Sequence, residues 1–315
     1  MTLQKENLSV SVSPHIYDKQ TTGGIMRDVL IALIPAALAS FYFFGMRAFL
    51  VILVSILGCL LSEWIFQKIV KKPSSLLDGS AVLTGVLLAF CLPSSIPLYM
   101  VFIGAGVSII IGKMVFGGLG HNIFNPALVG RAVLLASWPQ AMTTWPAANN
   151  IFLGMYDTVA GATPLAGIKL GQYTATYWDL FIGRTGGSLG ETCAVALLIG
   201  GVYLILRKVI SIAIPLTYIG SVYLLSSFLG IDPVYSILSG GLFLGAFFMA
   251  TDYVTSPMTS GGKLIFGLGC GLLTVMIRKF GGYPEGVCYA ILFMNGLVPL
   301  IERYTQPKVF GVKNK

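Results

Sequence analysis

The chain has 315 residues, of which 56% are hydrophobic and only 10% are charged, and its mean hydropathy is +0.84. Soluble domains carry about 25% charged residues, so this composition excludes an ordinary water-soluble protein. The formal net charge of +8 comes from Lys and Arg in small groups beside apolar runs. That placement is typical of membrane topology signals rather than of a nucleic-acid-binding surface, so we expect no nucleic-acid partner.

Apolar runs that can cross about 30 Å of hydrocarbon follow one another along the chain. Those near 79–93 and 123–138 are short for a full span, which indicates broken or re-entrant helices. The sequence therefore predicts an all-α integral membrane protein with about ten transmembrane helices. The predicted spans are 26–45, 47–70, 79–93, 97–115, 123–138, 190–206, 209–230, 234–251, 261–278 and 286–303.

The predicted spans form two series. Adding 164 to each of the first five starts gives a value within about ten residues of a later start, as the uncertainty of predicted boundaries allows. The same offset carries Phe116-Gly117-Gly118-Leu119 onto Phe280-Gly281-Gly282-Tyr283. We therefore expect two five-helix repeats, 26–138 and 190–303. An odd number of helices per repeat makes the two repeats inverted.

The distribution of Lys and Arg predicts the orientation, because positive residues in short loops stay in the cytoplasm. Assigned to alternate loops, fourteen lie on the side of the chain ends and five on the other, with Arg131 left inside a helix. The segments 1–25 and 304–315 are therefore predicted to be cytoplasmic, and the connection 139–189 external. Residues 1–20 lack the apolar core of a signal peptide, so we expect the first helix to direct insertion.

Metal ligands are scarce. The five cysteines lie in or beside apolar runs without C-x-x-C spacing, and His15 and His121 are far apart in the sequence. The pattern predicts neither a disulfide framework nor a zinc site. We expect no metal centre held by this chain alone.

The segment Asp157–Leu165 of the external connection holds a candidate modification site. Small residues, among them Gly161 and Ala162, leave the Thr163 hydroxyl open, and Pro164 restricts its backbone to extended conformations. A modifying enzyme could reach this hydroxyl. The alternative is a plain polar turn, and these nine residues by themselves favour the turn.

Two glycine-rich breaks precede helices. Gly117 and Gly118 lead to Asn125-Pro126, an N-cap and N1 pair, while Gly281 and Gly282 lead to the last predicted span. If these helices begin inside the membrane, their N-terminal N–H groups suit an anion or an electron-rich carbonyl at the pseudo-symmetric centre. Close packing at a helix kink is an equal alternative.

Four acidic residues lie in or near predicted spans, where a charge must face protein or water. For Glu63, Asp78 and Glu285 the pattern favours a place at the membrane interface. Asp252 is the best candidate for an ion path, because hydroxyls and freed backbone carbonyls surround it in the segment Ala250–Pro257.

Five motifs follow one another along the chain: Asp78–Ala81 with Thr84-Gly85, Phe116–Gly120 with Asn125–Ala127, Gly161–Thr163, Thr251-Asp252 with Thr255–Pro257, and Gly281–Gly286. Together they resemble the family of the D subunit of the Rnf electron-transport complex, and more distantly the B subunit of the sodium-pumping NADH:quinone reductase. The similarity runs over nearly the whole chain, from Ser13-Pro14-His15 to the Phe310-Gly311 tail.

The resemblance implies a membrane subunit of a redox-driven pump, in which electrons pass between ferredoxin and NAD while Na⁺ or H⁺ crosses a bacterial or archaeal cell membrane. It also implies FMN on Thr163 through a phosphoester bond. The motif departs at Ala160, where the family often has Ser or Thr, but Gly161, Ala162 and Thr163 fit. A chain without metal ligands needs an organic redox cofactor, and Arg184 or Lys169 are candidates to pair with the ester phosphate.

The family further implies a second, noncovalent flavin, such as riboflavin, for which Gly117, Gly118, Asn125, Gly281 and Gly282 form the expected cradle. Implied partners are a second flavoprotein subunit, iron–sulfur subunits, two further membrane subunits and the lipid bilayer. Two alternatives remain: a urea-channel-like solute transporter, because fold alone does not exclude it, and a structural membrane subunit without cofactor. The sequence does not distinguish Na⁺ from H⁺.

Overall fold

A computed structural model describes residues 21–146, 163–169, 175–282 and 285–307. These residues form helices and no β-strand. In chain order the elements are α1 (Thr22–Val70), the 3₁₀ turn η1 (Leu76–Asp78), α2 (Ser80–Phe90), α3 (Leu98–Ile109), the π-helix η2 (Ile110–Met114), α4 (Pro126–Ser137), α5 (Pro139–Met142), α6 (Pro164–Lys169), α7 (Tyr177–Ile182), α8 (Ala194–Leu206), α9 (Ala213–Phe228), α10 (Pro233–Leu238), α11 (Leu242–Leu244), the π-helix η4 (Gly245–Met249), α12 (Ser260–Phe280) and α13 (Val287–Thr305).

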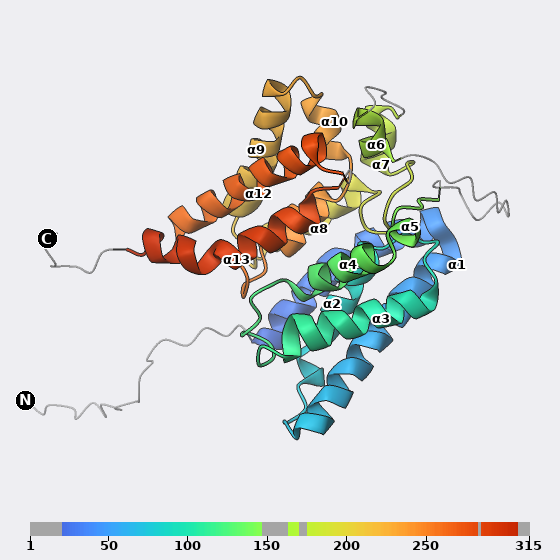
Figure 1. The fold of residues 1–315 in the computed structure, drawn as a ribbon, viewed down its shortest axis with the longest axis vertical. Coiled ribbons are helices and arrows are strands. Elements are labelled where there is room, and N and C mark those ends of the chain that lie inside the picture. Colours follow the sequence, from blue (N-terminus) through green and yellow to red (C-terminus); the bar gives the residue numbers. More distant parts are fainter. Residues whose placement is uncertain (1–20, 147–162, 170–174, 283–284, 308–315) are drawn as a thin grey trace, which may run out of the picture.

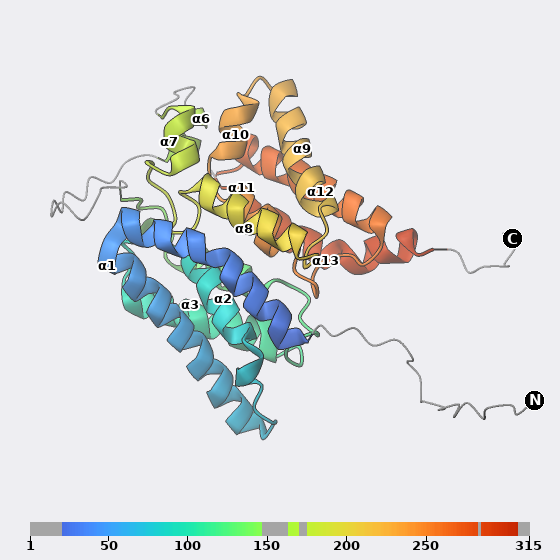
Figure 2. The ribbon, with the colours of Figure 1, turned by 180° about the vertical axis from the view of Figure 1, so that it is seen from behind.

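Helix α1 contains two predicted spans. Its 49 residues would extend well beyond a hydrocarbon core of about 30 Å if they were straight. Gly45 interrupts the helix with φ 59° and ψ −145°, a conformation that glycine adopts without steric cost. The two arms of α1 fold back on each other there (Figures 1 and 2), so Gly45 makes the turn between the predicted spans 26–45 and 47–70.

The remaining helices confirm an all-α membrane protein. Helices α12 and α13 are long and apolar enough to cross a bilayer, and α2, α3 with η2, α4, α8 and α9 are shorter apolar helices. The clearest interruption lies in the predicted span 234–251, which divides into α10, α11 and η4. Gly240 has φ +74° at that division, whereas the short predicted span 79–93 contains one continuous helix, α2. The count of ten spans stays a prediction.

The helices gather in two groups. Helices α1 to α4 lie together, and α9, α10, α12 and α13 form a second group, with α8 packed against α1 (Figures 1 and 2). Shifted back by 164 residues, α12 and α13 correspond to 96–116 and 123–141 and overlap α3–η2 and α4. The helices thus recur at the 164-residue offset, and the two repeats and their inverted relation stay predictions.

The described chain has two distinct ends. The first turns of α1 and the last turns of α13 lie toward one end, and α5, α6 and α7 lie toward the other (Figures 1 and 2). Which end faces the cytoplasm stays a prediction. The two ends matter for function because each holds a separate cavity.

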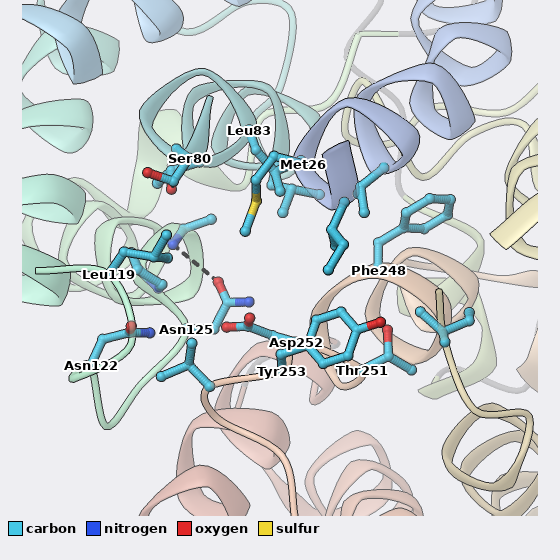
Figure 3. A pocket seen from close by; sticks show the side chains of 18 of the residues that line it. Met26, Ser80, Leu83, Leu119, Asn122, Asn125, Phe248, Thr251, Asp252 and Tyr253 are labelled. Atoms are coloured by element: carbon cyan, nitrogen blue, oxygen red, sulfur yellow. Dashed lines mark hydrogen bonds between the residues drawn. The ribbon is translucent and has the colours of Figure 1, made fainter. Parts of the chain in front are cut away.

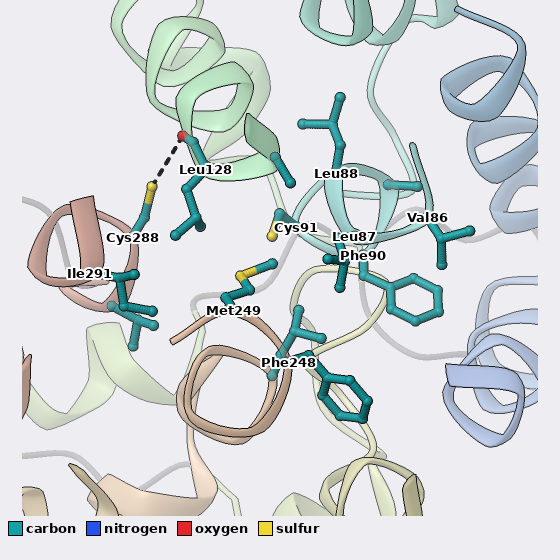
Figure 4. Packing of buried hydrophobic residues seen from close by; sticks show 14 of the residues in the cluster. Val86, Leu87, Leu88, Phe90, Cys91, Leu128, Phe248, Met249, Cys288 and Ile291 are labelled. Carbon is teal, nitrogen blue, oxygen red and sulfur yellow. Dashed lines mark hydrogen bonds between the residues drawn. The ribbon is translucent and has the colours of Figure 1, made fainter. Parts of the chain in front are cut away.

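Small residues let the helices approach closely, as is common between helices in membranes. A Cβ on Gly130 of α4 would lie 1.9 Å from the Ser108 Oγ and 2.8 Å from the Gly104 carbonyl of α3. Between the two groups, α2, α4, η4 and α13 share an apolar cluster that contains Cys91, Met249 and Ile291 (Figure 4). The two groups of helices, one from the first half of the chain and one from the second, therefore share one core.

Candidate functional site

Thr163 is the first described residue after position 146 in the connection 139–189. Its side chain is buried, with 8% of the residue exposed. The Oγ1 atom accepts a hydrogen bond of 3.2 Å from the backbone N–H of Ala166, as an N-cap hydroxyl does at the start of a helix. Pro164 follows as the first residue of α6. The turn thus fixes the hydroxyl in a defined position.

Thr163 borders a small cavity. The cavity walls come from the connection 139–189 and from the second predicted repeat, and they are rich in backbone, hydroxyl and carboxylate groups. The residues that line it are Thr163, Pro164, Leu165, Leu180, Thr185, Gly186, Gly187, Glu191, Thr192, Leu238, Ser239, Gly240 and Glu285. Folding therefore gathers polar groups from four distant segments around the predicted threonine.

Two carboxylates of this cavity share one arginine. Arg131 of α4 donates from Nη1 to Glu191 Oε1 over 2.8 Å and from Nη2 to Glu285 Oε2. The Arg131 and Glu191 side chains are each 5% exposed, and that of Glu285 is 17% exposed. A charge in the hydrocarbon region must be paired or face water, and the two glutamates provide that pairing beside Thr163.

The cavity has the character of a site for an attached polar group. Within the described residues, Thr192 Oγ1 and Arg131 Nε are buried without hydrogen-bond partners. Glycine keeps parts of the wall thin: a Cβ on Gly240 would meet Leu165 Cδ1 at 2.4 Å, and one on Gly241 would meet Glu191 Oε1 at 2.4 Å. The cavity wall therefore offers an unused polar atom and exposed backbone edges. A flavin on Thr163 stays a prediction.

A second cleft lies at the first turns of α1, and Figure 3 shows the side chains that line it. The beginnings of α1 and α2, the end of η2, the end of α8 and the segment after η4 form its walls. Asn125 is the N-cap of α4 and Pro126 its first residue, as predicted. The Asn125 amide donates to the Met249 carbonyl over 3.4 Å. Asn125 and Asp252 face this same cleft, which also contains the side chains of Ser80 and Lys113.

The two glycine breaks lie at different places. Gly117 and Gly118 have φ +127° and +109° and precede Leu119, which lines the Asn125 cleft. Gly281 lines a separate cavity near α6, and Gly282 is exposed. The first break therefore adjoins the Asn125 cleft and the second lies near the Thr163 end. Gly161 and Ala162 lie outside the described residues.

Glu63 and Glu285 each form an ion pair with a basic residue distant in sequence. Glu63 is fully buried within α1, where Lys113 donates to its Oε2 over 2.8 Å. Lys113 also donates to the Ser80 Oγ over 2.6 Å. Glu285 is drawn to Arg131 in the same way. A partner distant in sequence thus supplies the opposite charge to Glu63 inside the protein. The placement of Glu63 at the membrane interface stays a prediction.

Sequence reasoning missed the partners of Arg131. The signal was available, because an arginine inside a predicted span requires a counter-charge, but nothing local identified Glu191 or Glu285. Arg184 is exposed and does not line the Thr163 cavity, and the Lys169 side chain lies outside the described part. The described residues hold no group of three His, Cys, Asp or Glu that could bind a metal.

Comparison with known proteins identifies the family. The model of the NQR2, RnfD, RnfE family matches residues 9–311. The chain belongs to this family. It is 46% identical to the D subunit of the proton-translocating ferredoxin:NAD(+) oxidoreductase complex of Clostridium ljungdahlii, with 99% of this chain and 98% of that protein covered.

Two further relatives of the family are informative. The D subunit of the Na(+)-translocating ferredoxin:NAD(+) oxidoreductase complex of Acetobacterium woodii is 47% identical, with 97% of this chain and 96% of that protein covered. The D subunit of the ion-translocating oxidoreductase complex of Aliivibrio salmonicida is 36% identical over 96% of this chain and 98% of that protein. The family resemblance inferred from the motifs is confirmed.

Proposed function

We propose that this chain is the D subunit of an ion-translocating ferredoxin:NAD⁺ oxidoreductase complex and carries FMN on Thr163. The observation that supports the attachment is the place of the Thr163 hydroxyl. It lies in a cavity whose walls include a shared ion-pair cluster, and a turn of the backbone holds it. Relatives that are 46 and 47% identical over nearly the full chain bear the names of such complexes.

The residues of the Thr163 cavity have distinct roles in this proposal. Thr163 provides the Oγ of the phosphoester bond. Thr192 and the backbone around Gly186 and Gly240 bind the polar edges of the flavin, which supplies reversible electron transfer when bound. Glu191 and Glu285 share the charge of Arg131, so the cluster keeps a fixed field beside the cofactor.

The cleft at the other end is the proposed site of a second, noncovalent flavin such as riboflavin. Asn125 offers an amide, Lys113 an ammonium group, and Asp252 a carboxylate to a ligand there. Asp252 is also our candidate for the ion path, because this carboxylate faces a cleft between the two halves. The named relatives with 46 and 47% identity differ in their ion, so overall similarity does not select between Na⁺ and H⁺.

The proposal includes a topology and an assembly. The segments 1–25 and 304–315 lie in the cytoplasm of a bacterial or archaeal cell and 139–189 lies outside, so that Thr163 is reached from the external side. The partners are a second flavoprotein subunit, iron–sulfur subunits and two further membrane subunits. In this proposal the Asn125 cleft lies between the repeats 26–138 and 190–303, and the Thr163 cavity lies between the connection and the repeat 190–303.

Mass spectrometry of the peptide that contains Thr163 tests the attachment. The full chain is produced in cells that also make the flavin transferase, beside Thr163→Val and a control, Thr144→Val, whose hydroxyl contacts the Gln140 carbonyl away from the cavity. We expect FMN on the peptide that contains Thr163 in the native protein and in Thr144→Val. The corresponding peptide of Thr163→Val should carry none. A native peptide without flavin under these conditions would contradict the proposal and leave the channel and cofactor-free alternatives.

Extraction separates the second flavin from the first. Denaturing the purified protein releases noncovalent flavin, and filtration leaves covalent flavin with the chain. We expect Asn125→Leu to lower the released flavin and to leave the Thr163 peptide modified. A native protein that releases no flavin would refute this part alone, because the mass of the Thr163 peptide does not depend on it.

A further inference from the structure

A third cavity lies beside the Thr163 end and has a different character. It is lined by Leu165, Ser226, Ile231, Ser236, Val275, Arg278, Lys279 and Gly281. Its polar groups are the side chains of Arg278 and Lys279, the hydroxyls of Ser226 and Ser236, and backbone atoms. None of the residues that line it is acidic, so the cavity favours a negatively charged occupant.

Arg278 is the buried charge of this cavity. It lies in the last turn of α12 and only 6% of it is exposed. Its Nη1 donates to the Ser236 carbonyl over 2.6 Å, and its Nη2 donates to the Ser239 carbonyl over 3.1 Å. It forms no salt bridge with any carboxylate of the described residues.

The carboxylate of Glu191 is already paired with Arg131. Glu191 influences Arg278 through space, but its side chain forms the salt bridge with Arg131. In addition, the Arg278 Nε is buried and has no hydrogen-bond partner among the described residues. A buried cation with a spare donor and no counter-ion is costly, and a bound anion would relieve that cost.

Neighbouring groups could complete an anion site. Lys279 is exposed and its Nζ donates to the Leu229 carbonyl over 2.7 Å, which leaves two of its three donors for a ligand. Ser226 donates to the Ser236 hydroxyl over 3.0 Å. Gly240 opens the approach, because a Cβ there would lie 3.3 Å from the Arg278 Nη2 and 2.4 Å from Leu165 Cδ1.

We propose that the Arg278 cavity binds a phosphodiester group that carries net negative charge. Arginine suits phosphate because its planar donors match the phosphate oxygens, and the adjacent lysine adds a second charge. The cavity opens at the end of α12, beside the exposed Phe280 and Lys279, where a lipid headgroup would lie at the membrane surface. Leu165 lines both this cavity and the Thr163 cavity, so the Arg278 cavity adjoins the proposed attachment site as well.

Two sources share this chemistry. One is an anionic phospholipid, and the other is the phosphodiester that would link flavin to Thr163, so this second source rests on the proposed function. The two differ in one respect. A flavin phosphodiester would exclude added lipid from the cavity, whereas a lipid site would accept lipid whether or not Thr163 is modified.

The test measures binding of dioctanoyl phosphatidylglycerol to the full chain in neutral detergent, with zwitterionic dioctanoyl phosphatidylcholine as the comparison. The proteins are the flavin-bearing chain, Thr163→Val, and Thr163→Val combined in turn with Arg278→Gln, Lys279→Gln or a control, Arg303→Gln. The control removes one exposed charge from the end of α13. Lys279→Gln is included because Arg278 also binds the end of α10, so its replacement could unfold that region. Mass spectrometry of the Thr163 peptide records the flavin state.

We expect Thr163→Val to bind phosphatidylglycerol at least tenfold more tightly than phosphatidylcholine. In that background Arg278→Gln and Lys279→Gln should each weaken the affinity about tenfold and Arg303→Gln should not change it. If the flavin-bearing chain binds phosphatidylglycerol as tightly as Thr163→Val does, the occupant of the cavity is lipid. If the flavin-bearing chain binds it much more weakly, the occupant is the flavin phosphodiester. Absence of a preference for the anionic lipid in both proteins, or full affinity after Lys279→Gln and Arg278→Gln, overturns the proposal. A Thr163 peptide without flavin defeats the proposed function and leaves the lipid comparison valid.

Discussion

Arg131 and Glu191 are 60 residues apart in the chain and form a buried ion pair of 2.8 Å between Nη1 and Oε1. Arg131 comes from α4 in the first half, and Glu191 comes from the segment that precedes α8 in the second. That segment is held against the end of α2, where Leu189 N–H donates to the Leu92 carbonyl over 3.0 Å. The pair therefore joins the two halves beside Thr163.

Removing the charge of Arg131 should destabilise the protein strongly. In Arg131→Met, both Glu191 and Glu285 lose their buried partner, and breaking such a pair costs about 3–5 kcal/mol. Thermal unfolding in detergent measures the effect, with Arg207→Met as control because Arg207 and Asp28 pair at the surface, with Arg207 58% exposed. Equal midpoints for the two variants would show that the cluster adds nothing to stability.

The Lys113–Glu63 pair should show strong coupling between its members. Lys113→Met leaves the fully buried Glu63 carboxylate with hydrogen bonds from Ser75 and Gln67 and no cation. We expect the double variant Glu63→Gln/Lys113→Met to be more stable than Lys113→Met, because it removes the unpaired charge. The coupling should lie between about 0.5 and 3 kcal/mol, measured by a double-mutant cycle on unfolding in detergent. Additive effects would contradict the direct pairing.

The contact of α3 with α4 predicts a sharp size limit at Gly130. Its replacement by Ala places a Cβ against the Ser108 hydroxyl and the Gly104 carbonyl, and such overpacking costs about 1–3 kcal/mol. Gly220→Ala is the matched control, because a Cβ on that helical glycine meets nothing within 4 Å. Unfolding midpoints in detergent measure both. A Gly130→Ala protein as stable as the control would refute the close approach.

The contact of α7 with α10 should depend on pH. Tyr177 of α7 donates a hydrogen bond to the Asp232 carboxylate, which also accepts from the Tyr235 N–H over 3.0 Å. Partial burial acts to raise the pKa of Asp232, but these hydrogen bonds, with one from the Val234 backbone, outweigh it and hold the pKa below its ordinary value. A lowered pKa stabilises the folded form above the ordinary carboxyl pKa, and this stabilisation is lost as the pH falls through the lowered value.

Trp178 fluorescence reports this transition, because Trp178 lies beside Tyr177 in α7. We expect α7 to loosen in acid below the ordinary carboxyl range. Tyr177→Phe removes one of the bonds that lower the pKa of Asp232, so the midpoint should move to higher pH. Tyr223→Phe serves as control, because it removes a tyrosine hydroxyl from α9 and not from α7. An unchanged midpoint after Tyr177→Phe would contradict the assignment.

The sequence by itself determined the membrane class, the places of most helices and the N-cap at Asn125, because apolar length and capping are local properties that neighbouring residues encode. It also singled out Thr163, through a motif of adjacent residues. Only the tertiary structure decided that Glu191 and Glu285 share Arg131, that Glu63 binds Lys113, and that the two glycine breaks adjoin different cavities. Each of these depends on which distant segments meet, and burial makes that meeting energetically decisive because a charge in a low-dielectric interior requires a partner.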